Sequence, residues 1–419
     1  MTDFSVRLDR WRSAPRIGFL RPLEYGLALL ILLLMSQALL GPLLASEADP
    51  EGATLLRVMW LPVYAITAIW FVTRPMAGLS TALRIPLILI LSALCMVSMM
   101  WSLDPSMTLR RGFALVMTTA FGIALASRWS WRDLVGMIAI TFAILGVGSA
   151  MASLAAPGFA VHQDIHVGAW KGLWWEKNTL GAMMAFGAAA SLAAAAQFDR
   201  HRLLWWGIAA FEAGMVLMST SKTALLALCL ALAGAIGIAL VRRGFGFATL
   251  MIFLAVVGGG MLALVLTLAP MAALEALGRD ATLTGRTDIW AVLIGQIAAA
   301  PWTGYGYGAY WAAEYGPVFW VRQQTQWPVP TAHNGWLETA LALGIPGVVL
   351  MALSYTATLF RALARLFRGR ETYWALTFIA LVGLISLTES NLLQRNGLTW
   401  ALFVATSAKL AMPRRSGGR

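Results

Sequence analysis

The chain has 419 residues, of which 59% are hydrophobic and 12% are charged, and its formal net charge is +12. A soluble globular protein carries about 25% charged residues, so this composition leaves too little polar surface for a water-soluble body of this size. The positive charge does not indicate nucleic-acid binding, because basic residues also collect in the cytoplasmic loops of membrane proteins. The sequence therefore predicts an all-α polytopic membrane protein.

Apolar segments of roughly 17–25 residues recur along the chain, separated by charged residues, Gly and Pro. The first, at 23–44, follows five arginines, but it is longer than the roughly 7–15 apolar residues of a cleaved signal peptide. We therefore interpret it as the first of about twelve transmembrane helices. The predicted helices are 23–44, 58–73, 85–100, 112–126, 134–156, 179–197, 203–218, 224–241, 246–270, 335–360, 373–387 and 397–410.

The distribution of Lys and Arg predicts how these helices are oriented. With the N-terminus in the cytoplasm, the inner segments carry 21 of the 31 basic residues and the outer segments carry 10. The positive-inside rule then places both termini in the cytoplasm. The predicted parts are a cytoplasmic N-terminal segment (1–22), transmembrane helices 1–9 (23–270), a long periplasmic loop (271–334), transmembrane helices 10–12 (335–410) and a cytoplasmic tail (411–419).

The long outer loop at 271–334 is the first place where we expect chemistry, because loops of this length in a compact protein are usually functional. It contains a predicted short helix at 287–300, then a stretch rich in Gly and Tyr, then a Trp/Gln/Pro-rich approach to the next membrane helix. A smaller outer loop at 157–178 is rich in aromatic and charged residues.

Arg286 and Lys222 are basic residues on the outer side, where the charge rule disfavours them. Each stands at the start of a predicted helix, where unpaired N–H groups and the helix dipole attract anions, and arginine adds a planar five-donor fork. Both residues therefore predict phosphate contacts. The alternative is that each extends to the lipid headgroups or pairs with a loop acid such as Asp288.

His333 is the one histidine of four that lies at a predicted membrane boundary beside the long loop. An imidazole there can accept a proton near neutral pH. The alternative is an interfacial histidine that hydrogen-bonds its own loop. Glu338 lies about 140° around the helix from His333, so we expect no same-face contact, although a carboxylate one turn inside a membrane helix requires a partner.

A second candidate site is the pattern of His162, Asp164 and His166, which has the spacing of metal ligands. Nothing marks a further ligand nearby, and Gly168 disfavours a helix there, so a solvated loop is the favoured interpretation.

The stretch 303–306 is similar to the filter of potassium channels, but a filter requires a pore helix and a tetramer. We interpret it instead as loop turns that carry aromatic side chains for stacking on sugars. The candidate stacking residues are Trp174, Tyr305, Tyr307 and Trp311.

Taken together and in this order, motifs on the outer side resemble the O-antigen ligase/polymerase superfamily. They are Ser221-Lys222, Gly285-Arg286 with Trp290, the glycines at 304, 306 and 308, His333-Asn334 with Leu337, Gly344 and Gly347, and the segment 101–105 before Arg110 and Arg111. The segments 172–174, 177–181 and 388–391 resemble its ExoQ-like exopolysaccharide polymerase branch. Two positions depart from the pattern: Lys222 stands where the family usually has Arg, and Glu176 stands where this branch usually has His.

The resemblance implies a GT-C-like fold and a metal-independent inverting glycosyl transfer, without a cofactor, on the periplasmic face of a bacterial inner membrane. An undecaprenyl-diphosphate-linked oligosaccharide would be the donor and a sugar hydroxyl the acceptor, both within membrane lipid. His333 would take the acceptor proton, and Arg286 and Lys222 would neutralise the leaving diphosphate. Further expected substrate-binding residues are Arg110, Arg111, Lys177, Asn178, Tyr305, Asn334 and Glu389.

The favoured function is polymerisation of exopolysaccharide or O-antigen repeat units, with a chain-length regulator and a flippase as protein partners and no nucleic acid. The first alternative is a ligase that attaches polymer to lipid A-core. The second is a transporter or flippase of lipid-linked sugars, which requires charged residues along a path at mid-membrane depth. Only Glu212 is a candidate for such a position.

Overall fold

The computed structural model describes residues 20–44, 54–164, 166–268, 286–312, 316–325, 329–367 and 369–413. The arginines before residue 20, the segment 46–52 and Gly285 lie outside these ranges. Every regular element in the described residues is a helix, and their strand-like pairing is limited to an isolated bridge between Val161 and Trp170. The predicted all-α fold is therefore confirmed.

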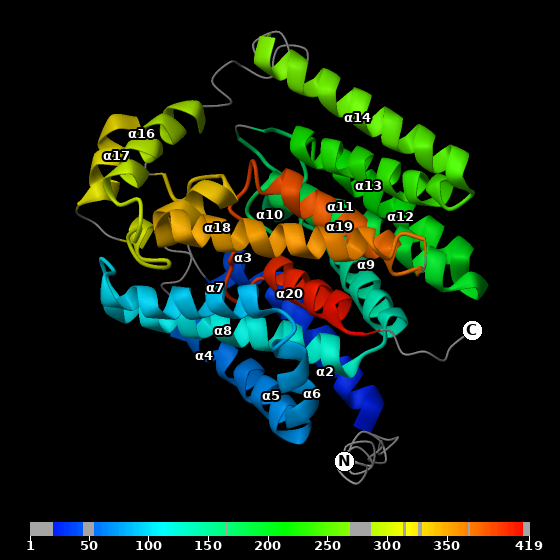
Figure 1. The fold of residues 1–419 in the computed structure, drawn as a ribbon. Helices are drawn as coiled ribbons and strands as arrows, with labels where there is room; N and C mark the ends of the chain where they lie inside the picture. The colour runs from blue at the N-terminus through cyan, green and yellow to red at the C-terminus, as the bar shows by residue number, and fades with distance from the viewer. Residues whose placement is uncertain are drawn as a thin grey trace.

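Long apolar helices form the body of the molecule (Figure 1). They are α2 (Leu20–Met35), α5 (Trp60–Thr73), α7 (Pro86–Val97), α8 (Pro105–Arg128), α9 (Trp131–Ala155), α11 (Lys177–Gln197), α12 (Arg202–Met218), α13 (Lys222–Val241), α14 (Phe245–Leu268), α18 (Gly335–Leu363), α19 (Thr372–Ile385) and α20 (Leu398–Ala411). Within the described ranges, each predicted apolar segment overlaps one of these helices. Shorter helices are α3 (Leu40–Leu44), α4 (Thr54–Val58), α6 (Pro75–Ala82), α10 (Pro157–Ala160), α16 (Arg286–Ala299) and α17 (Pro317–Thr325).

The protein is a polytopic membrane protein by the length and composition of its helices. In the part of the chain that the structure describes, α8, α9, α11, α13 and α18 are each long and apolar enough to cross a membrane. The α6–α7 pair gives a sixth candidate, bent by 92°. Shorter apolar helices include α5, α19 and α20.

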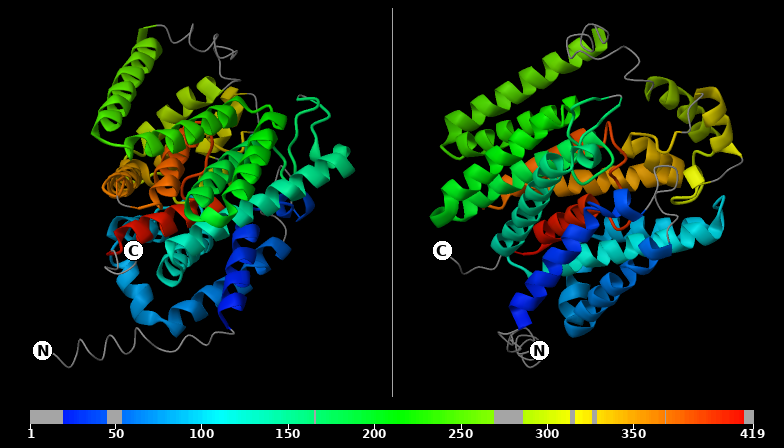
Figure 2. Two further views of the ribbon diagram at one scale, coloured as in Figure 1. Left: turned by 90° about the vertical axis from the view of Figure 1, so that its right-hand side faces the viewer. Right: turned by 180° about the vertical axis from the view of Figure 1, so that it is seen from behind.

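Helix α11 lies at the centre of the bundle, where it packs against α9, α12, α13 and α19. Its sequence is rich in Ala and Gly, and 78% of its most apolar stretch is buried. Small side chains let helix backbones approach closely, and this close packing drives helix association where lipid removes the hydrophobic contribution. At the edge of the bundle, α14 packs against α13 (Figures 1 and 2).

Two of the predicted helices differ from the structure by more than a few residues at one end or by an internal break. The segment 23–44 is broken after Met35 by a turn in which Gln37 and Leu39 have positive φ values of 56° and 63°, so α2 and α3 are separate. Helix α8 begins at Pro105, seven residues before the predicted start, because Asp104 caps it by accepting a hydrogen bond from the Met107 N–H at 2.9 Å. That hydrogen bond, and a second from Ser106, hold the pKa of the Asp104 carboxyl below its usual value.

Polar contacts divide the connections between helices into two groups, one at each end of the bundle. At the predicted inner end, Arg128 pairs with Glu24 at 2.9 Å, and Arg370 pairs with Asp199 at 2.8 Å. At the predicted outer end, the Trp101 indole donates to the Thr303 carbonyl at 2.8 Å. The Trp174 indole likewise donates to the Ser36 carbonyl there at 2.9 Å.

The short helices α16 and α17 cover the predicted outer end (Figures 1 and 2). The two groups of connections alternate along the chain, as the charge distribution predicts for inner and outer loops.

Cysteine labelling tests the orientation, in a background in which Cys95 and Cys229 are replaced by alanine. Asp164 has a side chain that is 76% exposed at the predicted outer end, and Arg370 has one that is 55% exposed at the inner end. We expect Asp164→Cys to react with a membrane-impermeant maleimide in intact spheroplasts, and Arg370→Cys to react only after lysis. The opposite labelling pattern would invert the topology.

Candidate active site

The described part of the long loop is folded onto the start of α18. Helices α16 and α17 and the segment around Tyr310 share a small apolar core, separate from the core of the bundle, with Leu341 of α18. Helix α16 (Arg286–Ala299) confirms the short helix predicted at 287–300. Its Trp290 indole donates to the Ala332 carbonyl at 2.9 Å, which attaches α16 to the residue immediately before His333.

The glycine-rich stretch at 304–308 is wedged between α18 and the start of α8. Gly306 has φ +93°, and a Cβ atom there would lie 2.7 Å from the Ser102 Cα. Gly344 interrupts α18 with φ +65°, and a Cβ there would lie 2.5 Å from the Pro301 carbonyl oxygen. Both positions require glycine because of backbone conformation and close approach. The stretch is a packed turn that fixes the loop to the bundle.

His333 lies just before α18 and is aimed at Glu389. Asn334 caps α18 by accepting hydrogen bonds from the N–H groups of Trp336 and Leu337 at 2.9 and 3.2 Å. His333 itself has φ +47°, a conformation that non-glycine residues adopt rarely. The His333 Nδ1 then lies 3.8 Å from the Glu389 Oε2, which is an ion-pair distance rather than a hydrogen bond.

Arg286 approaches the same carboxylate from the other side. It is the first residue of α16, and its guanidinium donates to the Thr388 carbonyl at 2.7 Å and to the Glu389 Oε1 at 3.2 Å. The side chains of Arg286, Glu389 and His333 are 15%, 27% and 24% exposed. We call these three residues the Arg–Glu–His cluster. The acid that Arg286 pairs with is thus Glu389, which follows α19, and the side chains remain partly open to a ligand.

The start of α18 is attached to the segment after α19 through the backbone. The Gly335 N–H donates to the Ser386 carbonyl at 2.8 Å, and the Asn334 side-chain amide donates to the Leu387 carbonyl at 3.3 Å. These bonds hold His333 and Glu389 next to each other. Asn334, expected to bind substrate, therefore has a structural role as a helix cap and an anchor in this structure.

Glu338 has the partners that a carboxylate in a membrane helix requires. Its Oε1 accepts a hydrogen bond from the Trp311 indole at 2.7 Å, and its Oε2 accepts one from the Ala332 N–H at 3.0 Å. Its direct hydrogen bonds thus go to the loop, in agreement with the helical spacing from His333.

Lys222 and Lys177 lie together at the same end of the bundle, as the first residues of α13 and α11. Ser221 caps α13 by accepting from the Ala224 N–H at 3.4 Å, and the Lys177 ammonium donates to the Thr220 hydroxyl at 3.4 Å. The charges of Lys177 and Lys222 are close enough to influence each other. Asn178 follows Lys177 in the first turn of α11. This lysine pair comes from different helices than the Arg–Glu–His cluster, and α13 packs along α19, which leads to Glu389.

The remaining predicted residues have varied surroundings. Arg110 is exposed in the first turns of α8, whereas the Arg111 guanidinium donates to the Gly308 carbonyl and so fixes the glycine-rich turn. The Tyr305 hydroxyl donates to the Gln296 carbonyl at 2.7 Å, and burial raises its pKa.

Two aromatic residues expected to stack on sugars are packed inside the protein instead. Tyr307 and Trp174 are each 5% exposed. The Tyr307 hydroxyl donates a hydrogen bond to the Leu393 carbonyl, and the Trp174 indole donates one to the Ser36 carbonyl. Neither offers a free ring face. Aromatic residues at loop positions do not by themselves distinguish packing from sugar binding, which is why the sequence misled here.

The loop with His162 and His166 is hydrogen-bonded to the start of α11. The His162 Nε2 accepts a hydrogen bond from the Lys177 N–H at 3.3 Å, and its Nδ1 lies 3.6 Å from Asp164. Burial, followed by the charges of Lys177 and His162, lowers the pKa of His166. Among the described residues, no group of three His, Cys, Asp or Glu side chains is arranged to hold a metal ion.

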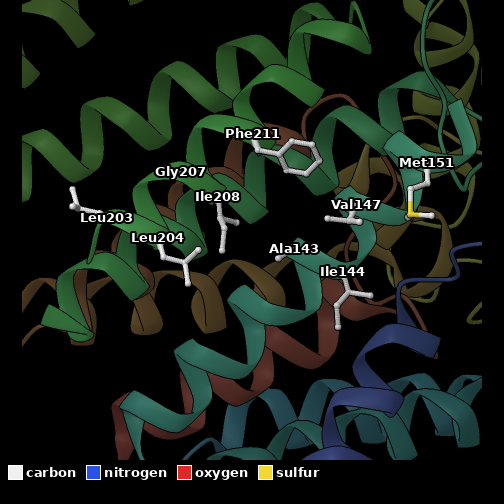
Figure 3. A pocket seen from close by; sticks show the side chains of 10 residues that line it. Ala143, Ile144, Val147, Met151, Leu203, Leu204, Gly207, Ile208 and Phe211 are labelled. Carbon is white, nitrogen blue, oxygen red and sulfur yellow. The ribbon is translucent and has the colours of Figure 1, made fainter. Parts of the chain in front are cut away.

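A groove of about 880 Å³ runs along the outside of the bundle between α9 and α12 (Figure 3). Its lining is apolar along its whole length, including Ile144, Val147, Met151, Leu204 and Phe211. Neither helix contributes a residue to the Arg–Glu–His cluster. In a bilayer such a surface is covered by lipid chains, which are as apolar as the groove itself.

Sequence reasoning assigned Arg286, His333 and Glu389 separate roles and did not predict that Glu389 joins the other two. The available signal was the short polar segment 388–391 between two membrane helices.

Comparison with known proteins finds a family match over part of the chain and a distant relative. Residues 207–352, which include Lys222, Arg286, His333 and Glu338, match the O-antigen ligase family. Over 345 residues the chain is 27% identical to the exopolysaccharide production protein ExoQ of Rhizobium meliloti (strain 1021), covering 76% of this chain and 75% of that protein. The resemblance predicted from the motifs is thereby confirmed: residues 207–352 match the O-antigen ligase family, and the chain is distantly similar to ExoQ.

Proposed function

We propose that this protein is a membrane glycosyltransferase that polymerises polysaccharide repeat units on the periplasmic face of a bacterial inner membrane. The donor is a glycan on undecaprenyl diphosphate, and the acceptor is a sugar hydroxyl on a second lipid-linked repeat. The observation that carries the proposal is the Arg–Glu–His cluster, which sets a base and a cation on two sides of one carboxylate at the end of the bundle covered by α16 and α17. The proposal includes twelve membrane crossings with both termini in the cytoplasm.

His333 acts as the general base in this proposal. Its Nδ1 faces Glu389, so in the Nδ1–H tautomer the atom that takes the proton of the acceptor hydroxyl is Nε2, which is buried in this structure. Glu389 stabilises the imidazolium that forms, as the carboxylate of a catalytic triad does. The acceptor oxygen forms a bond to the anomeric carbon while the bond from that carbon to the phosphate oxygen breaks, which inverts the configuration.

Arg286 and Lys222 stabilise the leaving undecaprenyl diphosphate. A guanidinium has five N–H donors, so Arg286 can hold Thr388 and Glu389 and still bind a phosphate oxygen. Preorganised cations of this kind act where charge develops in the transition state and often supply the largest part of catalysis. Lys222, supported by Lys177, provides a second charge at the N-terminus of α13. No metal ion takes part in the proposed reaction.

The alternative functions differ in acceptor or in class. A ligase would use the same donor chemistry with lipid A-core as acceptor, and the similarity to an exopolysaccharide production protein favours the polymerase. A transporter requires a polar path through the membrane. Glu212 accepts a hydrogen bond from Ser191 at 2.7 Å and is fully buried between α11 and α12, which is a local contact between helices.

Deletion of the gene distinguishes the polymerase from the ligase through the products that accumulate. Because a polymerase joins repeats, its loss leaves single repeat units on the lipid carrier. Loss of a ligase leaves long polymer that is not attached to lipid A-core. We expect single repeats by gel electrophoresis and mass spectrometry of the lipid-linked fraction, and long unattached polymer would favour the ligase instead.

His333→Ala removes the proposed base and should abolish polymer formation while the protein still accumulates in the membrane. The measurement is repeat-unit transfer from purified undecaprenyl-diphosphate-linked donor, with the amount of protein determined by immunoblot. His201→Ala is the matched control, because His201 lies at the predicted inner end between α11 and α12, and it should retain activity. Normal polymer yield in His333→Ala would exclude His333 as the base.

Exchanging the two cations separates charge from geometry. Arg286→Lys keeps the positive charge but cannot bind a phosphate through two N–H donors at once (bidentate binding). We therefore expect the transfer rate to fall by about 10²–10³, equivalent to roughly 3–4 kcal/mol. Lys222→Arg should remain active and Lys222→Ala should not, with Lys171→Ala as a control on the same face. The assays contain a chelator. Full activity of Arg286→Lys would reject bidentate phosphate binding by Arg286. A strict need for added divalent metal would reject the metal-free reaction.

A further inference from the structure

Glu338 is a charged residue in the first turn of α18 that the proposed reaction does not use. Its carboxylate accepts two hydrogen bonds from the loop, one from the Trp311 indole at 2.7 Å and one from the Ala332 N–H at 3.0 Å. It also lies next to Ser390, the neighbour of Glu389, and its charge reaches His333. Glu338 therefore lies beside the Arg–Glu–His cluster, next to the segment that carries His333 and the segment that carries Glu389.

Both polar backbone groups of Ala332, its N–H and its carbonyl, are hydrogen-bonded. Its N–H donates to Glu338, and its carbonyl accepts a hydrogen bond from the Trp290 indole at 2.9 Å. Its side chain is fully buried. With both groups bonded, the peptide planes on either side of Ala332 cannot rotate without losing a buried hydrogen bond, which is costly.

The constraint on Ala332 matters because His333 follows it directly with φ +47°. Such conformations in non-glycine residues persist where surrounding contacts determine them, and they are common at active sites. A rotation of the Ala332 peptide would move the His333 ring away from Glu389, to which its Nδ1 now lies at 3.8 Å.

We infer that Glu338 is a positioning residue, which acts through the Ala332 N–H to keep His333 in its left-handed conformation with the ring on Glu389. The inference rests on the proposed role of His333 as the base. Glu338 itself contacts neither the donor nor the acceptor. Its effect is on the rate of proton transfer, so substrate affinity should be nearly independent of it.

Glu338→Gln tests this role because it leaves one acceptor oxygen for two N–H donors. Competition from Trp311 then deprives the Ala332 N–H of its partner. Misplacement of a reacting group by about 1 Å lowers rates about 10²-fold, so we expect kcat for repeat-unit transfer to fall about 10²-fold with KM changed less than about twofold. Trp311→Phe alone leaves the Ala332 bond intact and keeps an aromatic ring at this candidate stacking position, so its kcat should stay within about threefold of the wild type.

The double variant Glu338→Gln/Trp311→Phe provides the decisive comparison. Removing the indole donor frees the single amide oxygen for the Ala332 N–H, so kcat should recover about tenfold relative to Glu338→Gln. Measured against the residual rate of repeat-unit transfer of His333→Ala, Glu338→Gln should cause no further loss, because residues that act as a unit are not additive. A residue needed only for folding predicts the reverse: a less stable double variant without recovery, and an independent loss in the His333→Ala background.

Either of those reverse results, or normal kcat in Glu338→Gln, would overturn the inference. Should Glu338→Gln not accumulate, Glu338→Asp replaces it in the same comparisons, because it keeps the charge but is too short to reach both donors. Failure of the proposed function has a different signature. Full activity of His333→Ala removes the base, whereas an inactive His333→Ala with a fully active Glu338→Gln removes only the positioning role.

Discussion

The Glu389 carboxylate lies between a cation and an imidazole. One of its oxygens is 3.2 Å from the Arg286 guanidinium and the other is 3.8 Å from the His333 imidazole. The three residues come from the long loop, the start of α18 and the segment after α19. Ion pairs that are partly exposed contribute little to stability, so these contacts do not assemble the site by themselves. Its assembly depends on the backbone bond between Gly335 and Ser386 and on the attachment of Ala332 to Trp290.

Charged residues at the two ends of the bundle differ in how completely the protein surrounds them. At the inner end, Arg128 has a side chain that is 2% exposed and is bonded to Glu24, to the Trp70 carbonyl and to Thr73. A buried charge of this kind needs such partners because desolvation is expensive. The Arg–Glu–His cluster is more open, with its side chains 15–27% exposed. An arginine held by protein groups on all sides suits a structural role, whereas a partly open one can exchange water for a phosphate.

The sequence was sufficient for the positions of the helices, and it failed where tertiary contacts decide. Hydrophobic length located every long helix in the described ranges, because a membrane segment has few other solutions. It missed the early start of α8, because a cap at Asp104 outweighs the polar residues that follow. It could not show that Glu389 joins Arg286 to His333, since that contact spans 103 residues. Helical spacing separated Glu338 from His333 but gave no sign that Glu338 binds the peptide before it.

The site thus consists of a rigid framework and a small number of partly open side chains. Trp290, Gly306 and Gly344 make contacts that hold the loop on α8 and α18. Packed interiors respond to small changes in volume or hydrogen bonding, so damage to the framework lowers the amount of folded protein as well as its activity. Changes to Arg286, His333 or Glu389 remove groups that the fold does not need for packing. Activity measured per amount of membrane protein therefore separates the two kinds of residue, and a low yield of polymer alone does not identify a catalytic group.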